Sequence, residues 1–366
     1  MREYLLICVV ALAVTFLMTP VVRALAVVIK AVTPLRERDV HTVPIPRLGG
    51  LAILAGLTAA TLVARQLPYL KGVYTSGQMT GVLLGATVIC LIGAIDDVRE
   101  LDWVTKFAGQ ALAAGVMAYK GVVMLHIPFF GTSTVLPQPV LIAVTIGIVL
   151  VTVNAVNWID GLDGLAAGIV AIAAAAFFAY SYLLSYTFNP PNVFSTATFV
   201  TAATLGCCLG FLPHNFNPAR LFMGDSGSLL LGLLLAAATI SITGNVDPST
   251  VSGDQVTAAL LPILAPLAVL SLPFLDVVLA IVRRTRARQK PWQADSKHLH
   301  HRMLQIGHGH RGAVLILYLW ASVLAFGIVL WVTIGGWLTL AAIGGVVLVA
   351  VTLTAYLPRW ARARRL

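Results

Sequence analysis

The chain has 366 residues, of which 59% are hydrophobic and only 10% are charged. Soluble domains carry about 25% charged residues, so this composition excludes both a soluble globular fold and a disordered chain. A mean hydropathy of +0.92 requires most segments to lie in lipid or to pack against segments that do. The formal charge of +10 does not indicate nucleic-acid binding, because the basic residues lie in short gaps between apolar runs.

Turn residues and charges divide the chain into eleven apolar runs, each close to the roughly 20 residues that a membrane-spanning helix needs. These runs are 4–29, 48–67, 79–95, 107–125, 139–157, 164–187, 196–213, 227–243, 256–282, 312–333 and 336–357. The first run is too long for a signal peptide and no small-residue cleavage site follows it, so we expect a retained helix. The sequence therefore predicts an all-α polytopic membrane protein whose residues 1–366 form one integral membrane domain.

The charged residues indicate how the helices are oriented. Gaps on the side opposite the N-terminus hold 19 of the 24 Lys and Arg residues, whereas gaps on the N-terminal side hold four. By the positive-inside rule the N-terminus lies outside and the C-terminus in the cytoplasm. Most acidic residues also fall in or beside the cytoplasmic gaps, and the outer gaps hold only Glu3, Asp247 and Asp254. Because carboxylates at membrane depth mark functional sites, we expect a site on the cytoplasmic face.

The first polar cluster is a pair of adjacent carboxylates, Asp96 and Asp97, at the end of the third run, with Lys106 at the start of the fourth. Neighbouring carboxylates repel each other unless a cation or a shared proton relieves the repulsion. The pair therefore indicates either a cation site or a plain helix end that meets solvent.

The second cluster places a polar side chain at every third position, with Asn154, Asn157, Asp160 and Asp163. Three-residue steps drift by only about 60° around a helix, so the first three side chains share a face. Gly161 and Gly164 would let the backbone turn there and approach a ligand closely. A polar turn alone would not need two amides buried in an apolar span.

The third cluster runs from Asn215 to Ser228 and contains Met-Gly-Asp-Ser-Gly, with Asp225 at its centre. Asp225 or Ser226 is expected to cap the eighth helix, whose free N–H groups would favour an anion such as phosphate.

The fourth cluster is a group of three histidines, His298, His300 and His301, inside a cytoplasmic loop of 29 residues, 283–311. Histidines with flanking cations suit a transition metal or a phosphate-rich ligand. The absence of nearby cysteines and the carboxylates elsewhere favour phosphate with a hard metal such as magnesium. His308 and His310 are expected to be solvated, and the four cysteines, all inside apolar runs, to be packing residues.

With these clusters in this order, the sequence resembles the polyprenyl-phosphate N-acetylhexosamine-1-phosphate transferases of glycosyltransferase family 4, which include the WecA and TagO enzymes and MraY. The resemblance covers residues 44–311 and rests on four motifs. These are the Asp-Asp pair with a following Lys, Asn-x-x-Asn-x-x-Asp-Gly-x-Asp-Gly, Met-Gly-Asp-Ser-Gly and His-x-His-His. The segment 46–50, Pro-Arg-Leu-Gly-Gly, also resembles the glycine-rich start of the family's second helix.

The resemblance implies an enzyme of the bacterial plasma membrane that moves a sugar 1-phosphate from a UDP-sugar to a polyprenyl phosphate and releases UMP. It implies Mg²⁺, or Mn²⁺, as cofactor, with Asp225 as the main ligand and Asn157 assisting. Asp96 or Asp97 would position the lipid phosphate or take its proton, while Lys106 neutralises phosphate charge.

The same resemblance assigns the remaining polar residues to the donor. The three histidines would grip the diphosphate or the sugar. The residues implied to bind substrate are Arg47, Asn154, Asn157, Asp160, Asp163 and Asn215. Its partners are then a UDP-sugar, a polyprenyl phosphate and membrane lipids, with no nucleic acid, and a homodimer is left open.

Two alternatives remain. The spacing His-x-His-His resembles the N-acetylglucosamine branch, whereas MraY, the phospho-N-acetylmuramoyl-pentapeptide transferase, has three consecutive histidines. A transporter of an anionic metabolite would spread polar groups through the membrane midplane and would have paired interrupted helices in two halves. Here the interior acids crowd at one interface, which favours the transferase.

Overall fold

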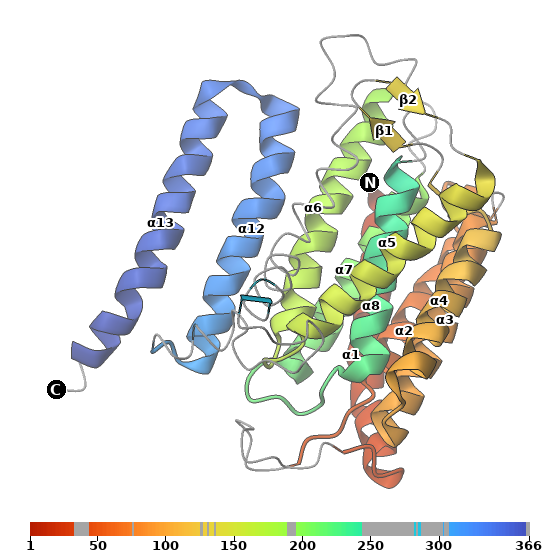
Figure 1. Cartoon of the computed structure of the whole chain (residues 1–366), viewed down its shortest axis with the longest axis horizontal. Coiled ribbons are helices and arrows are strands. Elements are labelled where there is room, and N and C mark those ends of the chain that lie inside the picture. The colour runs from red at the N-terminus through yellow and green to blue at the C-terminus, as the bar shows by residue number, and fades with distance from the viewer. Residues whose placement is uncertain are drawn as a thin grey trace.

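The computed structural model describes residues 1–32, 44–74, 77–124, 127–129, 132–134, 137–188, 195–243 and 307–363, with Val282, Thr285, Arg286 and Met303. These residues are almost entirely helical (Figure 1). The helices are α1 (Arg2–Val28), α2 (Gly49–Ala64), α3 (Gln78–Arg99), α4 (Trp103–Tyr119), α5 (Gln138–Ile159), α6 (Leu165–Phe188), α7 (Thr196–Asn215), α8 (Gly224–Thr243), α12 (His310–Ile334) and α13 (Gly336–Ala363). A short 3-10 helix, η1 (Leu70–Tyr74), and an antiparallel hairpin, β1 (Ile127–Phe129) with β2 (Thr132–Thr134), complete the described elements.

Ten of the eleven predicted runs coincide with helices, and the run 256–282 lies, except for Val282, outside the described residues. Eight described helices are long and apolar enough to cross a membrane. The other two, α2 and α4, have 16 and 17 residues. At 1.5 Å per residue they reach only about 24 to 26 Å, short of a hydrocarbon core of about 30 Å. The chain is therefore a polytopic helical membrane protein, and the count of eleven spans stays a prediction.

Helix α8 lies at the centre of the bundle. It packs against α2, α3, α5 and α7. In its most apolar stretch of 18 residues 94% of the residues are buried, compared with 28% in the corresponding stretch of α1. A helix that is apolar on all sides is expected to be enclosed by other helices. The leucines and alanines of α8 are accordingly buried. The N-terminal end of α8 is therefore held from several sides.

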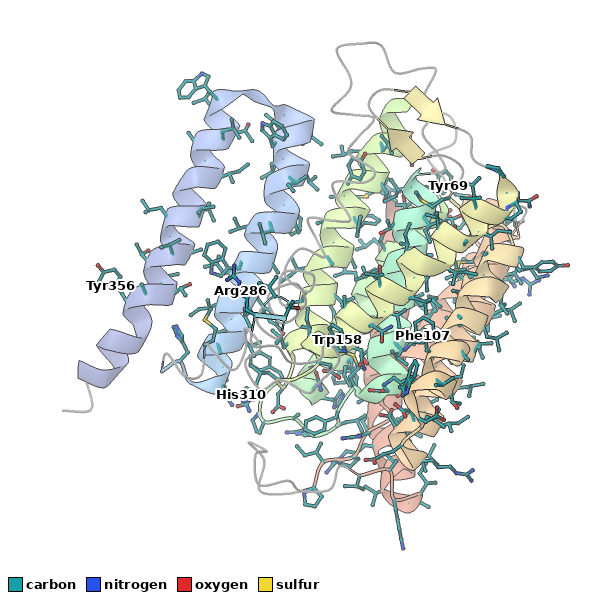
Figure 2. All side chains as sticks on the ribbon, viewed as in Figure 1. Tyr69, Phe107, Trp158, Arg286, His310 and Tyr356 are labelled. Atoms are coloured by element: carbon teal, nitrogen blue, oxygen red, sulfur yellow. The ribbon has the colours of Figure 1, made fainter. Side chains whose placement is uncertain are left out.

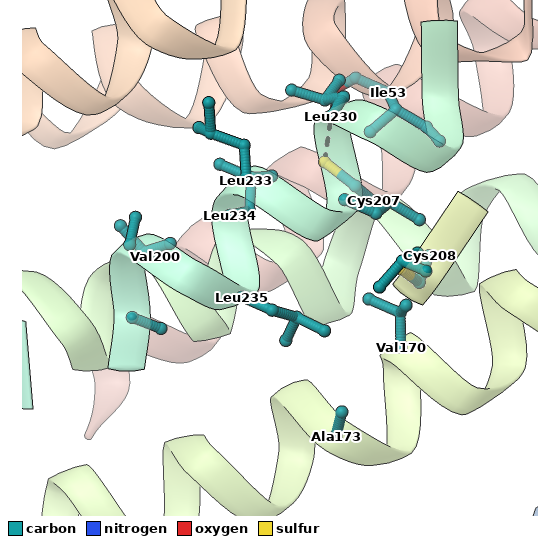
Figure 3. Packing of buried hydrophobic residues seen from close by; sticks show 14 of the residues in the cluster. Ile53, Val170, Ala173, Val200, Cys207, Cys208, Leu230, Leu233, Leu234 and Leu235 are labelled. Carbon is teal, nitrogen blue, oxygen red and sulfur yellow. Dashed lines mark hydrogen bonds between the residues drawn. The ribbon is translucent and has the colours of Figure 1, made fainter. Parts of the chain in front are cut away.

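Three of the four cysteines pack in the core as predicted, and none of the four forms a disulfide. Cys90, Cys207 and Cys208 are buried, and Cys8 is half-buried. The Cys207 thiol donates a hydrogen bond to the carbonyl of Ile53 on α2, at 3.4 Å (Figure 3).

Helices α12 and α13 form a hairpin beside the bundle, drawn in blue in Figure 1. Helix α12 packs on α6, and α13 packs on α12. Only 6% of the most apolar window of α13 is buried, and large side chains such as Trp337 and Leu348 are exposed. Such an apolar exposed face is expected of a helix surrounded by lipid.

The alternating directions of the helices bring the first three polar clusters to one end of the bundle. Helices α3, α5 and α7 end there, whereas α4, α8 and α12 begin there. In Figure 2, Phe107, Trp158 and His310 lie towards this end, and Tyr69 lies at the other. Residues far apart in sequence meet there as a result, such as Asp97 and Ser226, which are 129 positions apart.

Candidate active site

Glycines on two neighbouring helices let the backbone of α8 come close at its N-terminal end. A Cβ atom on Gly50 of α2 would lie 2.2 Å from the Ser226 carbonyl carbon, and one on Gly93 of α3 would lie 2.5 Å from that of Asp225. The N–H of Gly50 also donates to the Met223 carbonyl at 3.3 Å. The glycine-rich segment 46–50 therefore packs against the Met-Gly-Asp-Ser-Gly motif, which the sequence places about 175 residues later.

The N-terminus of α8 is capped by Asp97, which comes from α3. Its carboxylate accepts hydrogen bonds from the backbone N–H groups of Asp225 at 2.8 Å and Ser226 at 3.1 Å. Gly224 has a φ of +69°, and a Cβ there would lie 2.3 Å from the same carboxylate, so only glycine fits. The prediction that Asp225 or Ser226 caps this helix is wrong, because Asp97 accepts the N–H groups that were expected to bind phosphate.

Two other acidic side chains at this end, Asp96 and Asp225, pair with one ammonium group. The Nζ atom of Lys106 lies 3.0 Å from Asp96 Oδ2 and makes a second ion pair with Asp225 Oδ2. The amide nitrogen of Asn157 donates to Asp225 Oδ1 at 2.8 Å and to the Ser228 hydroxyl at 2.9 Å. Three predicted clusters, on α3–α4, α5 and α8, therefore meet at Asp225.

Local structure sets the position of Lys106 and of Asp96. Asp102 caps α4, accepting from the N–H groups of Val104 and Thr105 at 3.0 Å each, so Lys106 lies in the first turn. Asp96 Oδ1 accepts from the Leu101 N–H at 2.6 Å, which fixes the carboxylate at the end of α3. Both members of the Lys106–Asp96 ion pair are thus held by their own helix ends.

The donor atoms in this cluster suit a hard cation. Mg²⁺ is usually bound by one or two carboxylates together with substrate phosphates and water. Asp225, Asp96 and the amide oxygen of Asn157 are oxygen ligands of this kind, and Asn157 uses only its nitrogen in the hydrogen bonds above. In the described part of the chain no three His, Cys, Asp or Glu side chains group closely enough to enclose a metal ion by themselves.

Asp160 follows α5, and its carboxyl interacts electrostatically with the same cluster. Burial raises the pKa of its carboxyl to about 7, the nearby carboxylates Asp225 and Asp97 act in the same direction, and the Arg47 guanidinium opposes them. Arg47 is thus close enough to Asp160 to affect it, and its backbone N–H binds the Ala31 carbonyl at 2.9 Å. The predicted residues Arg47, Asp160 and Asp225 are therefore near enough for the charges of Arg47 and Asp225 to act on Asp160.

Asp163 and Asn215 join two loops, 160–164 between α5 and α6 and 216–223 between α7 and α8, which we call the site loops. Asp163 Oδ2 accepts from the Asn217 amide at 3.0 Å and the Ala219 N–H at 3.1 Å. Asn215 accepts from the Gly164 N–H at 3.1 Å and donates to the Leu221 carbonyl at 3.0 Å. Gly164 turns the chain with a φ of +80°, as the sequence predicted.

Asn154 lies one turn before Asn157 and is bound between helices. Its amide nitrogen donates to Gln110 Oε1 on α4 at 2.7 Å and to the Leu150 carbonyl at 2.8 Å. Gln110 is 1% exposed, so this pair forms a buried polar link between α4 and α5.

The two histidines that were expected to be solvated are both bound, so that prediction is wrong. His308 is 6% exposed, and its Nε2 lies 3.0 Å from the Thr354 carbonyl of α13. His310 Nε2 accepts from the Asp163 N–H at 3.2 Å. The glycines around both histidines favoured a loop in solvent, whereas the apolar run that begins at residue 312 marks them as close to a helix start. The predicted residues His298, His300 and His301 lie outside the described residues.

Residues 79–243 match the sequence family described as glycosyl transferase family 4. A decaprenyl-phosphate N-acetylglucosaminephosphotransferase from Mycolicibacterium smegmatis is 46% identical over 331 residues, which cover 89% of this chain and 82% of that protein. The chain belongs to glycosyl transferase family 4. The matched residues 79–243 hold α3 to α8 and include Asp96, Lys106, Asn157 and Asp225.

Other members of glycosyl transferase family 4 are similar over different lengths. A probable undecaprenyl-phosphate N-acetylglucosaminyl 1-phosphate transferase from Bacillus subtilis is 33% identical over 91% of this chain and 86% of its own length. A phospho-N-acetylmuramoyl-pentapeptide-transferase from Desulforudis audaxviator is 37% identical, but over 53% of this chain and 62% of its own length.

Proposed function

We propose that this family member transfers N-acetylglucosamine 1-phosphate from UDP-N-acetylglucosamine to a polyprenyl phosphate in the membrane and releases UMP, the first lipid-linked step of a cell-envelope glycan. The main observation that supports this proposal is the cluster at one end of an apolar helical bundle that is formed by Lys106, Asp96, Asn157 and Asp225. A reaction between two phosphate compounds, one soluble and one in lipid, needs charged groups at a membrane interface.

Asp225 and Asn157 are the proposed metal ligands, with Asp96 beside them. The chemistry that bound Mg²⁺, or Mn²⁺, supplies is neutralisation of charge on the diphosphate and on the departing UMP. The arrangement of oxygen donors around a single ammonium group supports this assignment.

The chain's own residues would align the two substrates. Lys106 binds the acceptor phosphate, and Asp96 positions that phosphate or takes its proton. An acceptor oxygen forms a bond to the sugar-bearing phosphorus, and the bond from that phosphorus to the bridging oxygen breaks. UMP leaves with that electron pair. Asp97 holds the N-terminus of α8, so its proposed role is to orient Asp225.

The donor would lie beside the site loops. The charges of Arg47 and of the cluster both act on Asp160, which supports a role for Asp160 and Arg47 in binding the nucleotide diphosphate. Asp163 and Asn215 hold the loops in place, and Asn154 holds α5 against α4. His298, His300 and His301 are proposed to grip the diphosphate or the sugar.

We further propose eleven spans in the bacterial plasma membrane, with the site facing the cytoplasm. Helix α8 runs away from the site end and α12 begins at that end, which supports a further crossing between them such as the predicted run 256–282. The 19 basic residues on that side support the cytoplasmic orientation.

The pentapeptide donor is the second candidate, because relatives of that name share the chemistry and part of the sequence. Relatives named for N-acetylglucosamine are similar over 89% and 91% of this chain, which favours the first. The transporter hypothesis has no support from the relatives above.

The test is to incubate the purified chain with a radiolabelled UDP-sugar, a polyprenyl phosphate and Mg²⁺, and then to separate the lipid products. Label from UDP-N-acetylglucosamine should enter the lipid fraction, and the Asp225→Asn variant should lose most of this activity while keeping its fold. Use of the pentapeptide donor alone would overturn the donor assignment. Full activity of Asp225→Asn would overturn the ligand assignment.

A further inference from the structure

The first turns of α12 bind both site loops through backbone atoms. His310 Nε2 accepts from the Asp163 N–H at 3.2 Å, and Arg311 Nε donates to the Asn217 carbonyl at 3.0 Å. Two turns later, the Tyr318 hydroxyl donates to the Gly164 carbonyl. One helix therefore contacts a loop that follows α5 and a loop that precedes α8.

The side chain of Asp163 makes this arrangement a closed set of hydrogen bonds. Its backbone N–H binds His310, while its carboxylate binds the Asn217 amide and the Ala219 N–H of the other loop. Arg311 binds the carbonyl of the same Asn217. A shift of α12 would therefore move both loops together.

The site loops are directly joined to the residues of the proposed donor site. Asp160 is the first residue of one loop, and the other loop ends one residue before Gly224, which begins α8 and precedes Asp225. Nine residues before His310 lies His301, the last member of the predicted histidine group. Residues 310–311 thus connect the start of α12 to the loop on each side of the cluster.

We propose that His310 and Arg311 are positioning residues for the donor, in that hydrogen bonds from the first turn of α12 fix the two site loops against each other. This inference rests on the proposed function. Neither residue is proposed to touch the reacting phosphorus; both act through the backbone of Asp163 and Asn217.

A matched control lies two residues away in the same segment. His308 is also hydrogen-bonded to a backbone atom, but that atom is the carbonyl oxygen of Thr354 on α13, away from the site loops. A leucine at residue 308 or 310 removes one histidine hydrogen bond in either case. Only the substitution at residue 310 leaves the Asp163 N–H without its acceptor.

The experiment measures binding of UDP-N-acetylglucosamine to the purified full chain in detergent, together with the KM values for donor and acceptor. The variants are His310→Leu, His310→Gln and His308→Leu. One lost hydrogen bond corresponds to a change of about 2- to 10-fold, so His310→Leu should raise the donor Kd and KM by that factor. The acceptor KM should stay within about twofold, a split that a general loss of folding would not produce.

Glutamine should restore donor binding, because its side-chain oxygen can take the place of Nε2 as an acceptor, and His308→Leu should bind donor like the wild type. If His310→Leu does not fold, His310→Asn replaces it, since its shorter amide falls short of the Asp163 nitrogen. Unchanged donor binding in the leucine or asparagine variant, or an equal loss in His308→Leu, would overturn the inference alone. A wild-type chain that neither binds nor uses the donor would overturn the proposed function as well.

Discussion

Asp96 and Asp97 are neighbours in the chain, yet their carboxylates bind different partners. Asp97 is 8% exposed and accepts two N–H groups at the start of α8, where the helix dipole also favours a negative charge. Asp96 binds Lys106, which also pairs with Asp225. The two adjacent carboxylates therefore have different roles. Asp97 anchors the N-terminus of α8, and Asp96 belongs to the charged cluster.

This division predicts different effects for two similar substitutions. Asp97→Asn would keep one acceptor but turn an N–H donor towards α8, so we expect a loss of about 1 to 3 kcal/mol in stability and a reduced activity. Asp96→Asn should lose activity with little change in stability. Thermal denaturation in detergent and turnover should be measured for both variants. A melting temperature of Asp97→Asn equal to that of the wild type would contradict the anchoring role.

Asp160 gives a prediction about pH. Its pKa is raised to about 7 in the folded protein, compared with about 3.9 in an unfolded chain. Between these values the folded state holds a proton that the unfolded state has lost, so stability falls as the pH rises from about 4 to about 7. Asp160→Asn removes this titration. The melting temperature of Asp160→Asn minus that of the wild type should therefore be larger at pH 8 than at pH 5, both measured in EDTA. An equal difference at the two pH values would contradict this prediction.

Which single residues could be predicted from the sequence depended on their surroundings. Asp96, Asn157 and Asp225 stood out because polar side chains in apolar runs are expensive unless they serve a function. The partners of these residues could not be predicted, because partners depend on how closely the helices pack. Asp97, for example, reaches α8 only because glycines let the helices come close together. His310 was misread for a similar reason, since its partner is a backbone N–H, which has no sequence signature.

The helices themselves could be predicted because hydropathy is a local property of the chain. All ten described helices that match a predicted run follow from it. Which helix lies at the centre cannot be predicted in this way, since α8 and α13 are both apolar enough to span a membrane but differ in burial, 94% against 6%. The difference arises from contacts with small residues on α2 and α3, which let the backbones approach.

The close approach at α8 can be tested with glycine substitutions. Gly50→Ala and Gly93→Ala would place a methyl group 2.2 and 2.5 Å from backbone atoms of α8, so each should cost about 1 to 3 kcal/mol or more. Gly115→Ala and Gly147→Ala are the controls, because nothing lies within 4 Å of the added group. These controls should gain about 0.5 to 1 kcal/mol from helix propensity. Similar melting temperatures for all four variants would argue against tight packing at α8.

At the scale of the whole molecule, two independent patterns coincide. The first three polar clusters meet at the end of the bundle where α3 and α5 end and α4 and α8 begin. The basic residues predict that this same end faces the cytoplasm, where UDP-sugars are made. The sequence could predict this end because charge is counted over whole gaps, and errors of a few residues at helix ends do not change the count.

The orientation can be tested by labelling single cysteines on intact cells. Lys71, exposed in η1 at the end opposite the site, is expected outside, and Arg288 is expected in the cytoplasm. Three native cysteines are buried, so a Cys8→Ser chain provides a low background for an impermeant thiol reagent. Lys71→Cys should react on intact cells, and Arg288→Cys only after the cells are opened. The reverse pattern would put the carboxylate cluster outside the cell, beyond the reach of a cytosolic nucleotide donor, and would contradict both the topology and the proposed reaction.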